Sequence, residues 1–262
     1  MPIRASSFAG YVACDYRALL DHQIQAGELA PSPPHSSPYA ALGTITHYFS
    51  QRAVNARFIE EPTISSEDWS LAASLFGDDL TTLQRVVDLN ARRVVEMLPS
   101  MSWTAELAVE TDRLTGHLDL INDDRTVMVD IKTTARKPDH MLTKPEHLVQ
   151  MAQYRLLVPT LRKCYVPYVD SLKAGWGILC EIDFTTDEFV TLLSRYERYC
   201  EYLNNRDLLQ AMAVPRMGPA CKSLFCPHRE RCLDTHIREP GILYESAAAR
   251  VTAPRLVNPF GG

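Results

Sequence analysis

Two short apolar runs that carry charged residues are the strongest constraint on how this chain folds. The runs span 116–121 and 127–134, with Asp119 in the first and Asp130 and Lys132 in the second. A short polar turn joins them, so the pattern predicts a β-hairpin. A carboxylate is unfavourable in an apolar strand unless a partner compensates its charge. The hairpin therefore predicts a site at which buried acids share a partner, and a metal ion is the simplest one.

Strand periodicity indicates which of these side chains share a face. Alternate residues point the same way, so Asp130 and Lys132 lie together while Ile131 turns into the core. Asp119 can face Asp130 across the ladder. Carboxylate oxygens suit Mg²⁺ or Mn²⁺, which can polarise a phosphoryl oxygen and activate water. The alternative for this short pattern alone is an exposed hairpin whose acids and lysine make a surface ion pair.

Two predicted helices carry further candidate residues. Lys144-Pro145 opens a helix on which Gln150 and Tyr154, four residues apart, share a face. A helix over 40–56 carries His47. Taken alone, His47 is a surface or core histidine, and Tyr154 is a partly buried packing residue.

The ordered set of residues is similar to a family pattern: His47, Gly116, Asp119, Asp130, Lys132, Gln150 and Tyr154. This order and spacing resembles the RecB-like branch of the PD-(D/E)XK nuclease superfamily, from Ser6 to Cys232. Leu118 stands where the superfamily name has proline, which is common in this branch. The resemblance implies an α/β fold of the restriction-endonuclease type, a mixed central sheet flanked by helices.

The resemblance also implies roles. The ligands of Mg²⁺ or Mn²⁺ would be His47, Asp119, Asp130 and the backbone carbonyl of Ile131. Lys132 would orient the attacking water or stabilise the pentavalent phosphate, and Gln150 and Tyr154 would position the DNA strand. The implied activity is a metal-dependent DNA exonuclease acting on single strands or free ends.

A predicted strand over 104–111 carries further acids. Glu106 or Glu110 could add a metal ligand, since relatives carry a glutamate near this point, but the sequence does not choose between them. Surface exposure is the alternative for either.

The cysteines divide into two groups. An odd count of 7 argues against a disulfide framework, and Cys164, Cys180 and Cys200 fit a buried core. Three others gather in a turn-rich stretch and need a fourth ligand, for which Cys14 is the candidate. The predicted ligand set is therefore Cys14, Cys221, Cys226 and Cys232. Four thiolates hold either Zn²⁺ or a [4Fe–4S] cluster, and the resemblance favours [4Fe–4S]. Reduced thiols without a metal are the alternative.

The domain prediction follows from length and from this cysteine set. One nuclease domain is expected over 1–262, with 6–26 and 207–235 forming the cluster region and an irregular tail over 240–262. Other expected helices span 6–26 and 66–98, the latter with a break near Gly77, and one more begins at a capping box over 185–188 and reaches about Asn204. A further strand is expected over 175–184, and the proline-rich stretch 30–38 is interpreted as a spacer.

Charge and hydropathy limit the partners. The net charge of −5 excludes a basic nucleic-acid binder overall, so phosphate binding must be local. Lys132, Arg136, Lys137 and Lys144 form either a phosphate-facing lip or a solvated loop. No membrane span or secretory signal is evident, and the predicted compartment is the cytoplasm, that of the host for a viral protein.

Two other functions stay open from the sequence. One is a non-catalytic DNA-binding or assembly subunit that keeps the nuclease fold, although the intact Asp130-x-Lys132 argues against it. The other is a restriction-like endonuclease. The sequence specifies neither a homo-oligomer nor a protein partner.

Overall fold

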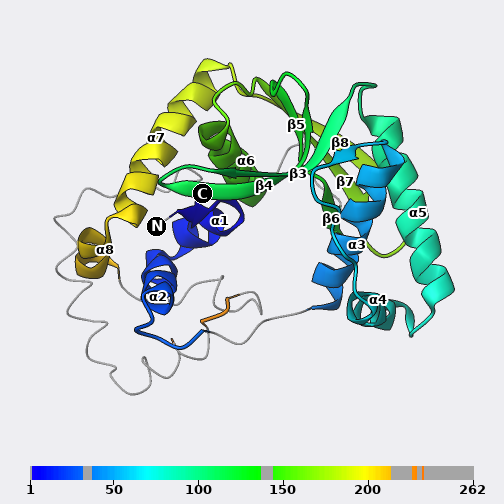
Figure 1. The fold of residues 1–262 in the computed structure, drawn as a ribbon, viewed down its shortest axis with the longest axis horizontal. Helices are drawn as coiled ribbons and strands as arrows, with labels where there is room; N and C mark the ends of the chain where they lie inside the picture. The colour runs from blue at the N-terminus through cyan, green and yellow to red at the C-terminus, as the bar shows by residue number, and fades with distance from the viewer. Residues whose placement is uncertain (1, 32–36, 137–143, 214–225, 229–231, 233–262) are drawn as a thin grey trace.

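A mixed β-sheet with helices on both faces organises the protein (Figure 1). The computed structural model describes residues 2–31, 37–136, 144–213, 226–228 and 232. Within these ranges, the sheet has eight strands, some parallel and some antiparallel. The predicted α/β fold class is confirmed. In the same ranges, no helix combines the length and the apolar character that crossing a bilayer requires.

The elements follow one another along the chain in an α/β pattern. They are β1 (Ile3–Arg4), α1 (Ala5–Ala13), α2 (Asp15–Gln25), α3 (Pro38–Ala53), β2 (Arg57–Phe58), α4 (Ser66–Ala73), the 3₁₀ turn η1 (Ser74–Phe76), α5 (Leu80–Met97), β3 (Trp103–Glu110), β4 (Leu114–Asn122), β5 (Val127–Val129), β6 (Lys132–Thr134), α6 (Pro145–Leu157), β7 (Lys163–Asp170), β8 (Gly177–Asp183), α7 (Asp187–Asn204) and α8 (Arg206–Met212).

The sheet combines antiparallel hairpins with parallel pairings, which join β1 to β4, β2 to β3, and both β5 and β6 to β7. Its main order is β2-β3-β4-β5-β7-β6, with β1 added beside β4 and β8 beside β7. Strands β3, β4 and β5 are antiparallel neighbours, whereas β5 and β6 both pair with β7 in parallel. Parallel strands need a crossover, and α6 supplies it between β6 and β7. The crossover fixes α6 over the strands that carry Asp119, Asp130 and Lys132.

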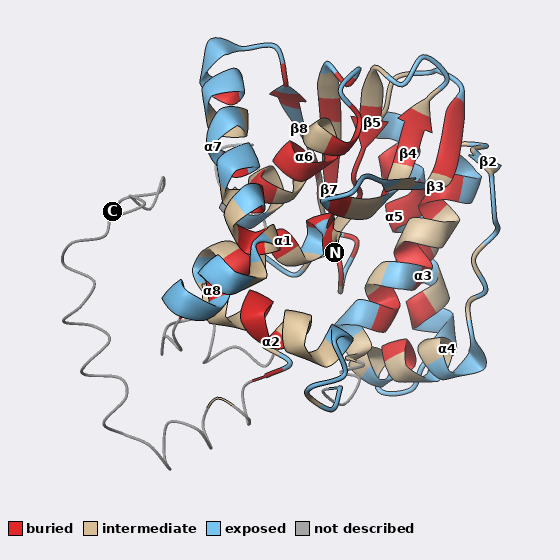
Figure 2. Ribbon diagram, turned by 60° about the vertical axis from the view of Figure 1, so that its left-hand side comes forward, coloured by how far each residue is buried: buried red, intermediate tan, exposed pale blue. Residues whose placement is uncertain are grey.

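Helices cover the two faces of the sheet in separate layers (Figure 1). Helices α1, α6 and α7 pack on one face, and α5, backed by α3 and α4, packs on the other. Figure 2 shows the central strands buried and the outer surface of α7 exposed. The strands alternate as expected: Cys164, Val166 and Tyr168 of β7 face α6, while Ile131 and Val169 join the core under α5.

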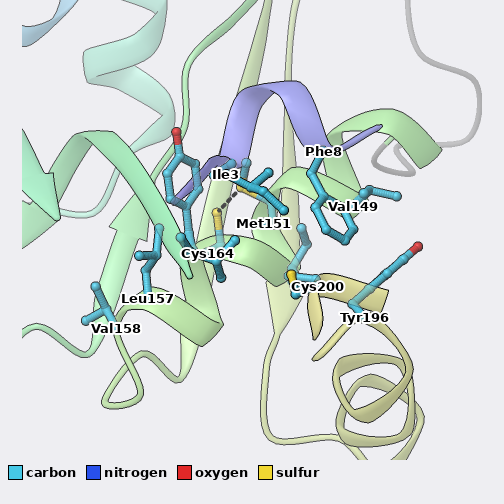
Figure 3. Close-up of a cluster of buried hydrophobic side chains, with 14 of the residues drawn as sticks. Ile3, Phe8, Val149, Met151, Leu157, Val158, Cys164, Tyr196 and Cys200 are labelled. Carbon is cyan, nitrogen blue, oxygen red and sulfur yellow. Dashed lines mark hydrogen bonds between the residues drawn. The ribbon is translucent and has the colours of Figure 1, made fainter. Parts of the chain in front are cut away.

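The core under α6 is close-packed and apolar. In Figure 3, Val149 and Met151 of α6 lie among Phe8 of α1, Cys164 of β7 and Cys200 of α7. The expected burial of Cys164, Cys180 and Cys200 is confirmed. Burial of this kind stabilises by about 25 cal/mol per Å² of apolar surface, so α6 is held firmly over the sheet.

Some predicted elements are divided in the structure. The helix expected over 6–26 breaks at Cys14, whose backbone is extended (φ −155°, ψ 101°). The strand expected over 127–134 breaks at Asp130 and Ile131, because β5 pairs with both β4 and β7 while β6 pairs with β7 alone. The break near Gly77 is confirmed, with that residue in the left-handed region at φ 64°. The spacer 30–38 and the tail 240–262 lie partly or wholly outside the described residues.

Strand β7, at the centre of the parallel pairing, is absent from the sequence prediction. It contains Pro167, which a central strand normally excludes because proline has no N–H to donate. Here Tyr165 pairs with the end of β5 and Tyr168 with the start of β6. Pro167 therefore lies at the break between β5 and β6, where that side of the ladder has no strand partner for it.

Gly116 allows α6 to approach β4 closely, and its substitution tests this packing. A Cβ at Gly116 would lie 2.8 Å from Cε1 of Tyr154, so we expect Gly116→Ala to reduce the free energy of unfolding by about 1–3 kcal/mol. Urea unfolding measures the change. The matched control is Gly177→Ala, where the new Cβ meets the flexible end of Met97 at 3.2 Å and a smaller loss is expected. Equal losses in the two variants would contradict this account.

Candidate active site

Helix α3 brings His47 to the hairpin. Its first turn is capped by Ser37, whose hydroxyl accepts a hydrogen bond from the amide of Ala40 at 3.1 Å. Its apolar face packs on α4 and α5 through Leu42 and Ile45. The opposite face turns to β4, and there Nδ1 of His47 lies 3.4 Å from Oδ2 of Asp119.

Asp119 also closes the break between β5 and β6. Its Oδ2 accepts the amide N–H of Ile131 at 2.7 Å, so a side chain replaces the ladder partner that β4 no longer supplies. Burial alone would raise the pKa of Asp119, but the charges of His47 and Lys132 outweigh it and lower that pKa. Asp119 is therefore held as a carboxylate.

Asp130 is the most deeply buried acid of the site, with 2% of its side chain exposed. Nζ of Lys132 lies 2.6 Å from its Oδ2, yet within the described residues no aligned hydrogen bond reaches that oxygen. Burial raises the pKa of Asp130 to about 6 in spite of Lys132, and the neighbouring Asp119 adds to the rise. The pairing of Asp130 with Lys132, and the burial of Ile131 between them, match the prediction from strand alternation.

Helix α6 contributes the remaining polar side chains of the site, Gln150 and Tyr154. Lys132 Nζ donates to Oε1 of Gln150 at 2.9 Å. Nε2 of Gln150 donates to the hydroxyl of Tyr154 at 3.1 Å, and that hydroxyl donates to the carbonyl of His117 at 2.7 Å. This chain of hydrogen bonds fixes the orientation of the Gln150 side chain and, through it, the position of the Lys132 ammonium.

The expected contact between Tyr154 and a DNA strand does not fit its position. Tyr154 is buried, with 4% of its surface exposed, and its hydroxyl already bridges α6 to β4. Its contact with the rest of the site is the hydrogen bond that its hydroxyl accepts from Gln150. The i, i+4 spacing predicted that Gln150 and Tyr154 share a helix face. It could not show that β4 covers the part of this face that carries Tyr154.

Gln51 is a site residue that the sequence interpretation missed. It lies one helical turn after His47 and is fully buried. Its Nε2 donates to Oε1 of Glu106 at 2.5 Å and to the carbonyl of Asp119 at 3.1 Å. The same i, i+4 rule that links Gln150 to Tyr154 could have found it.

The structure separates the two acids of β3. Glu106 lies opposite Asp119, between the register pairs Ala105↔Leu120 and Leu107↔Leu118. Its φ of 54° is in the left-handed region, a strained conformation that is typical of functional sites when it occurs inside a strand. Burial raises the pKa of Glu106, although the hydrogen bond from Gln51 opposes the rise. Glu110 is exposed at the far end of β3, opposite Thr115.

The donor set fits a hard divalent cation. The carboxylates of Asp119 and Asp130 and the imidazole of His47 gather here, and the buried Oδ2 of Asp130 is paired with the ammonium of Lys132 without a further hydrogen bond among the described residues. Carboxylate oxygens are the donors that such a cation prefers. Among the described residues, no group of three or more His, Cys, Asp or Glu side chains could hold a metal ion in the observed arrangement. Lys132 occupies the space beside Asp130, so a cation at Asp130 requires the ammonium to shift toward Gln150.

Comparison with known proteins identifies the family. The family model described as the PD-(D/E)XK nuclease superfamily matches residues 3–233. The chain belongs to this superfamily. The matched range includes the hairpin that carries Asp119, Asp130 and Lys132.

Solved structures show weaker likenesses. A phage-related exonuclease from Haemophilus somnus 129PT has a TM-score of 0.45 and 10% identity, over 81% of this chain and 97% of its own. An alkaline exonuclease from Laribacter hongkongensis has a TM-score of 0.30 and 16% identity, over 61% of this chain and 91% of its own. At these values, neither likeness bears on function. No curated protein matches the chain significantly.

The cysteines of the expected cluster are only partly within the described residues. Cys14 lies between α1 and α2, Cys226 and Cys232 lie near the end of the described chain, and Cys221 lies outside it. These three described thiols are half-buried and form no disulfide. The segment that holds Cys226 and Cys232 is tied to α2, because Nε2 of the buried His228 lies 2.7 Å from Oδ1 of Asp21.

A buried histidine beside the site gives a prediction about acid stability. Burial, with the charges of Lys132 on β6 and Lys144 on α6, lowers the pKa of His147 to about 3. The neutral hydroxyl of Tyr168 on β7 is its hydrogen-bond partner at 2.7 Å. A depressed histidine pKa contributes stability above about pH 6.5, and this contribution is lost as pH falls toward the folded pKa.

We therefore expect His147→Phe to be less sensitive to acid than the wild type. Between pH 7 and pH 5, the wild type should lose about 1–2 kcal/mol more unfolding free energy than the variant. Urea unfolding of both proteins at each pH measures the difference. A parallel pH dependence in the two proteins would mean that His147 titrates normally.

Proposed function

We propose that this protein is a metal-dependent deoxyribonuclease that hydrolyses phosphodiester bonds, and that it acts as an exonuclease on single strands or DNA ends. One observation carries the proposal: His47, Asp119, Asp130 and Lys132 meet at the break between β5 and β6. A buried carboxylate and a half-buried one beside a lysine suit metal-assisted phosphoryl chemistry, and they would lower stability without such a role.

The residues that would hold Mg²⁺ or Mn²⁺ are His47, Asp119, Asp130 and the Ile131 carbonyl, with Glu106 as an additional carboxylate opposite Asp119. A divalent cation bound there would polarise a phosphoryl oxygen and activate a water molecule. Asp119 serves as a fixed anchor, since Ile131 and His47 hold its carboxylate.

Lys132 supplies positive charge to the phosphate undergoing attack. Its Nζ is held between Asp130 and Gln150, within hydrogen-bond reach of both. Gln150 accepts a hydrogen bond from this ammonium and would orient it toward the charge that develops on the phosphate. Tyr154 fixes Gln150 and so positions it indirectly.

Three features support the RecB-like branch. His47 approaches the acids from α3, and Gln150 and Tyr154 approach from α6, which are the additions that distinguish that branch from the bare superfamily pattern. An exonuclease activity and a DNA substrate are proposed on this resemblance together with membership of the superfamily. We propose that residues 1–262 form one nuclease domain.

Cleavage of end-labelled single-stranded DNA with Mn²⁺ tests the activity. We expect degradation by the wild type and a loss of at least about 100-fold in Asp130→Ala and Lys132→Ala. Asp124→Ala, an exposed acid in the turn of the same hairpin, is the matched control and should keep wild-type activity. A circular single strand should resist the enzyme. Retained cleavage in Asp130→Ala would contradict the site, and DNA binding without cleavage by the wild type would favour a non-catalytic subunit.

We further propose a structural [4Fe–4S] cluster held by Cys14, Cys221, Cys226 and Cys232. Cys14 interrupts α1 and α2 with an extended backbone, and the His228–Asp21 contact ties the C-terminal thiols to α2. These features fit a metal that joins the two ends of the chain. Four thiolates would be the ligands of the cluster.

Anaerobic purification tests the cluster. We expect bound iron and visible iron–sulfur absorption in the wild type, and a loss of both in Cys226→Ser. Cys180→Ser, a buried core thiol, is the control and should retain iron. Colourless protein that contains one zinc and no iron would replace the cluster with a zinc site.

A further inference from the structure

Two rows of side chains face one another across the space between α6 and the sheet. On α6 and at its start, Lys144, His147, Gln150 and Tyr154 recur at intervals of three or four residues and share one helix face. Each contacts a residue of the sheet. The inner pair, Gln150 and Tyr154, belongs to the proposed active site. The outer pair, Lys144 and His147, has no part in it.

On the sheet, Thr134 and Tyr168 lie next to Lys132 and contact this outer pair. Thr134 follows Lys132 by two residues on β6, so both point to the same face. Tyr168 of β7 pairs with Lys132 in register. Nζ of Lys144 donates to Oγ1 of Thr134 at 3.0 Å, which places this second ammonium beside the same strand as Lys132.

The ring of His147 and the backbone amide of Lys144 both contact the hydroxyl of Tyr168. The amide of Lys144 donates to the hydroxyl oxygen of Tyr168 at 3.1 Å. Nδ1 of His147 lies 2.7 Å from the same hydroxyl oxygen. The two rings stack, with centroids 5.5 Å apart and planes inclined by 27°. Where the hydroxyl donates to Nδ1, the neutral ring carries its proton on Nε2.

Lys144 keeps its charge available. Within the described part of the chain, Nζ has no carboxylate within ion-pair distance. Its contacts are a neutral hydroxyl and the ring of Tyr168, whose centroid lies 5.8 Å away. A cation and an N–H donor side by side, with no acid between them, match the acceptor oxygens of a phosphodiester.

We propose that Lys144 and His147 form a second phosphate subsite, which binds a phosphodiester one to three nucleotides from the bond that is cleaved. The helical rise puts His147 about 4.5 Å and Lys144 about 9 Å along α6 from Gln150. A DNA strand advances about 3.4 Å per nucleotide in a duplex. This subsite rests on the proposed nuclease function, since it extends that site along its substrate.

The subsite has a role distinct from the chemistry. Lys132 acts on the phosphate that reacts, whereas Lys144 and His147 hold the strand in register with it. Tyr168 is a positioning residue that orients His147 through its hydroxyl. The subsite therefore accounts for three side chains next to the active site that the reaction itself does not use.

Single neutral linkages in the substrate test the proposal. End-labelled single strands would carry one methylphosphonate at successive positions, and cleavage with Mn²⁺ would be followed under single-turnover conditions. Lys144→Gln removes the charge, and His147→Phe removes the N–H while keeping a ring to stack on Tyr168. Arg195→Gln, on the exposed face of α7, removes one charge elsewhere and serves as control.

With the wild type, we expect one neutral linkage within three nucleotides of the cleaved bond to slow the reaction by about 10- to 100-fold. Lys144→Gln and His147→Phe should be slowed similarly on ordinary DNA and should lose their sensitivity to that one linkage. Arg195→Gln should behave as the wild type. If Lys144→Gln and His147→Phe stay as sensitive as the wild type to a neutral linkage at every position of the substrate, the subsite proposal is wrong.

The proposed function and the subsite fail in different ways. A wild type that binds DNA without cutting it contradicts the nuclease proposal. The subsite is then judged by the affinity of the same oligonucleotides, where the neutral linkage should weaken wild-type binding and leave the two variants unchanged. Equal weakening in the wild type and both variants would overturn it.

Discussion

The contact between the carboxylate of Asp119 and the amide of Ile131 is the constraint on which the site depends. At this point β5 ends and β6 begins, and β4 no longer supplies a backbone acceptor. An unpaired buried amide would be unfavourable, so Asp119 is locked in place. That contact in turn fixes where His47, Asp130 and Lys132 meet.

The crossover helix α6 determines which further residues lie beside the acids of the hairpin. Parallel pairing of β5 and β6 with β7 requires a connection over one face of the sheet, and α6 makes it. Its apolar side is buried against α1, α7 and β7. Its polar side therefore faces β6, where it contacts Lys132 and Thr134. The same burial positions Gln150 for chemistry and, in our proposal, Lys144 and His147 for the strand beyond it.

The site also carries local features that stability alone does not favour. Glu106 takes a left-handed backbone inside β3, and Asp130 has a buried oxygen without a hydrogen bond in the described structure. Backbone strain and a buried acid balanced by a single lysine are typical of sites that bind a ligand. In our proposal, a divalent cation is the partner that these acids would share.

The sequence by itself determined the α/β class, the hairpin with its acids and lysine, and the shared face of Gln150 and Tyr154, because these depend on residue spacing within one element. Only the tertiary structure decided the rest. It placed Pro167 in a central strand at a break, buried Tyr154 under β4, brought Gln51 to Glu106, and set His147 against Tyr168. Such contacts join residues far apart along the chain, and their geometry follows from how whole elements pack.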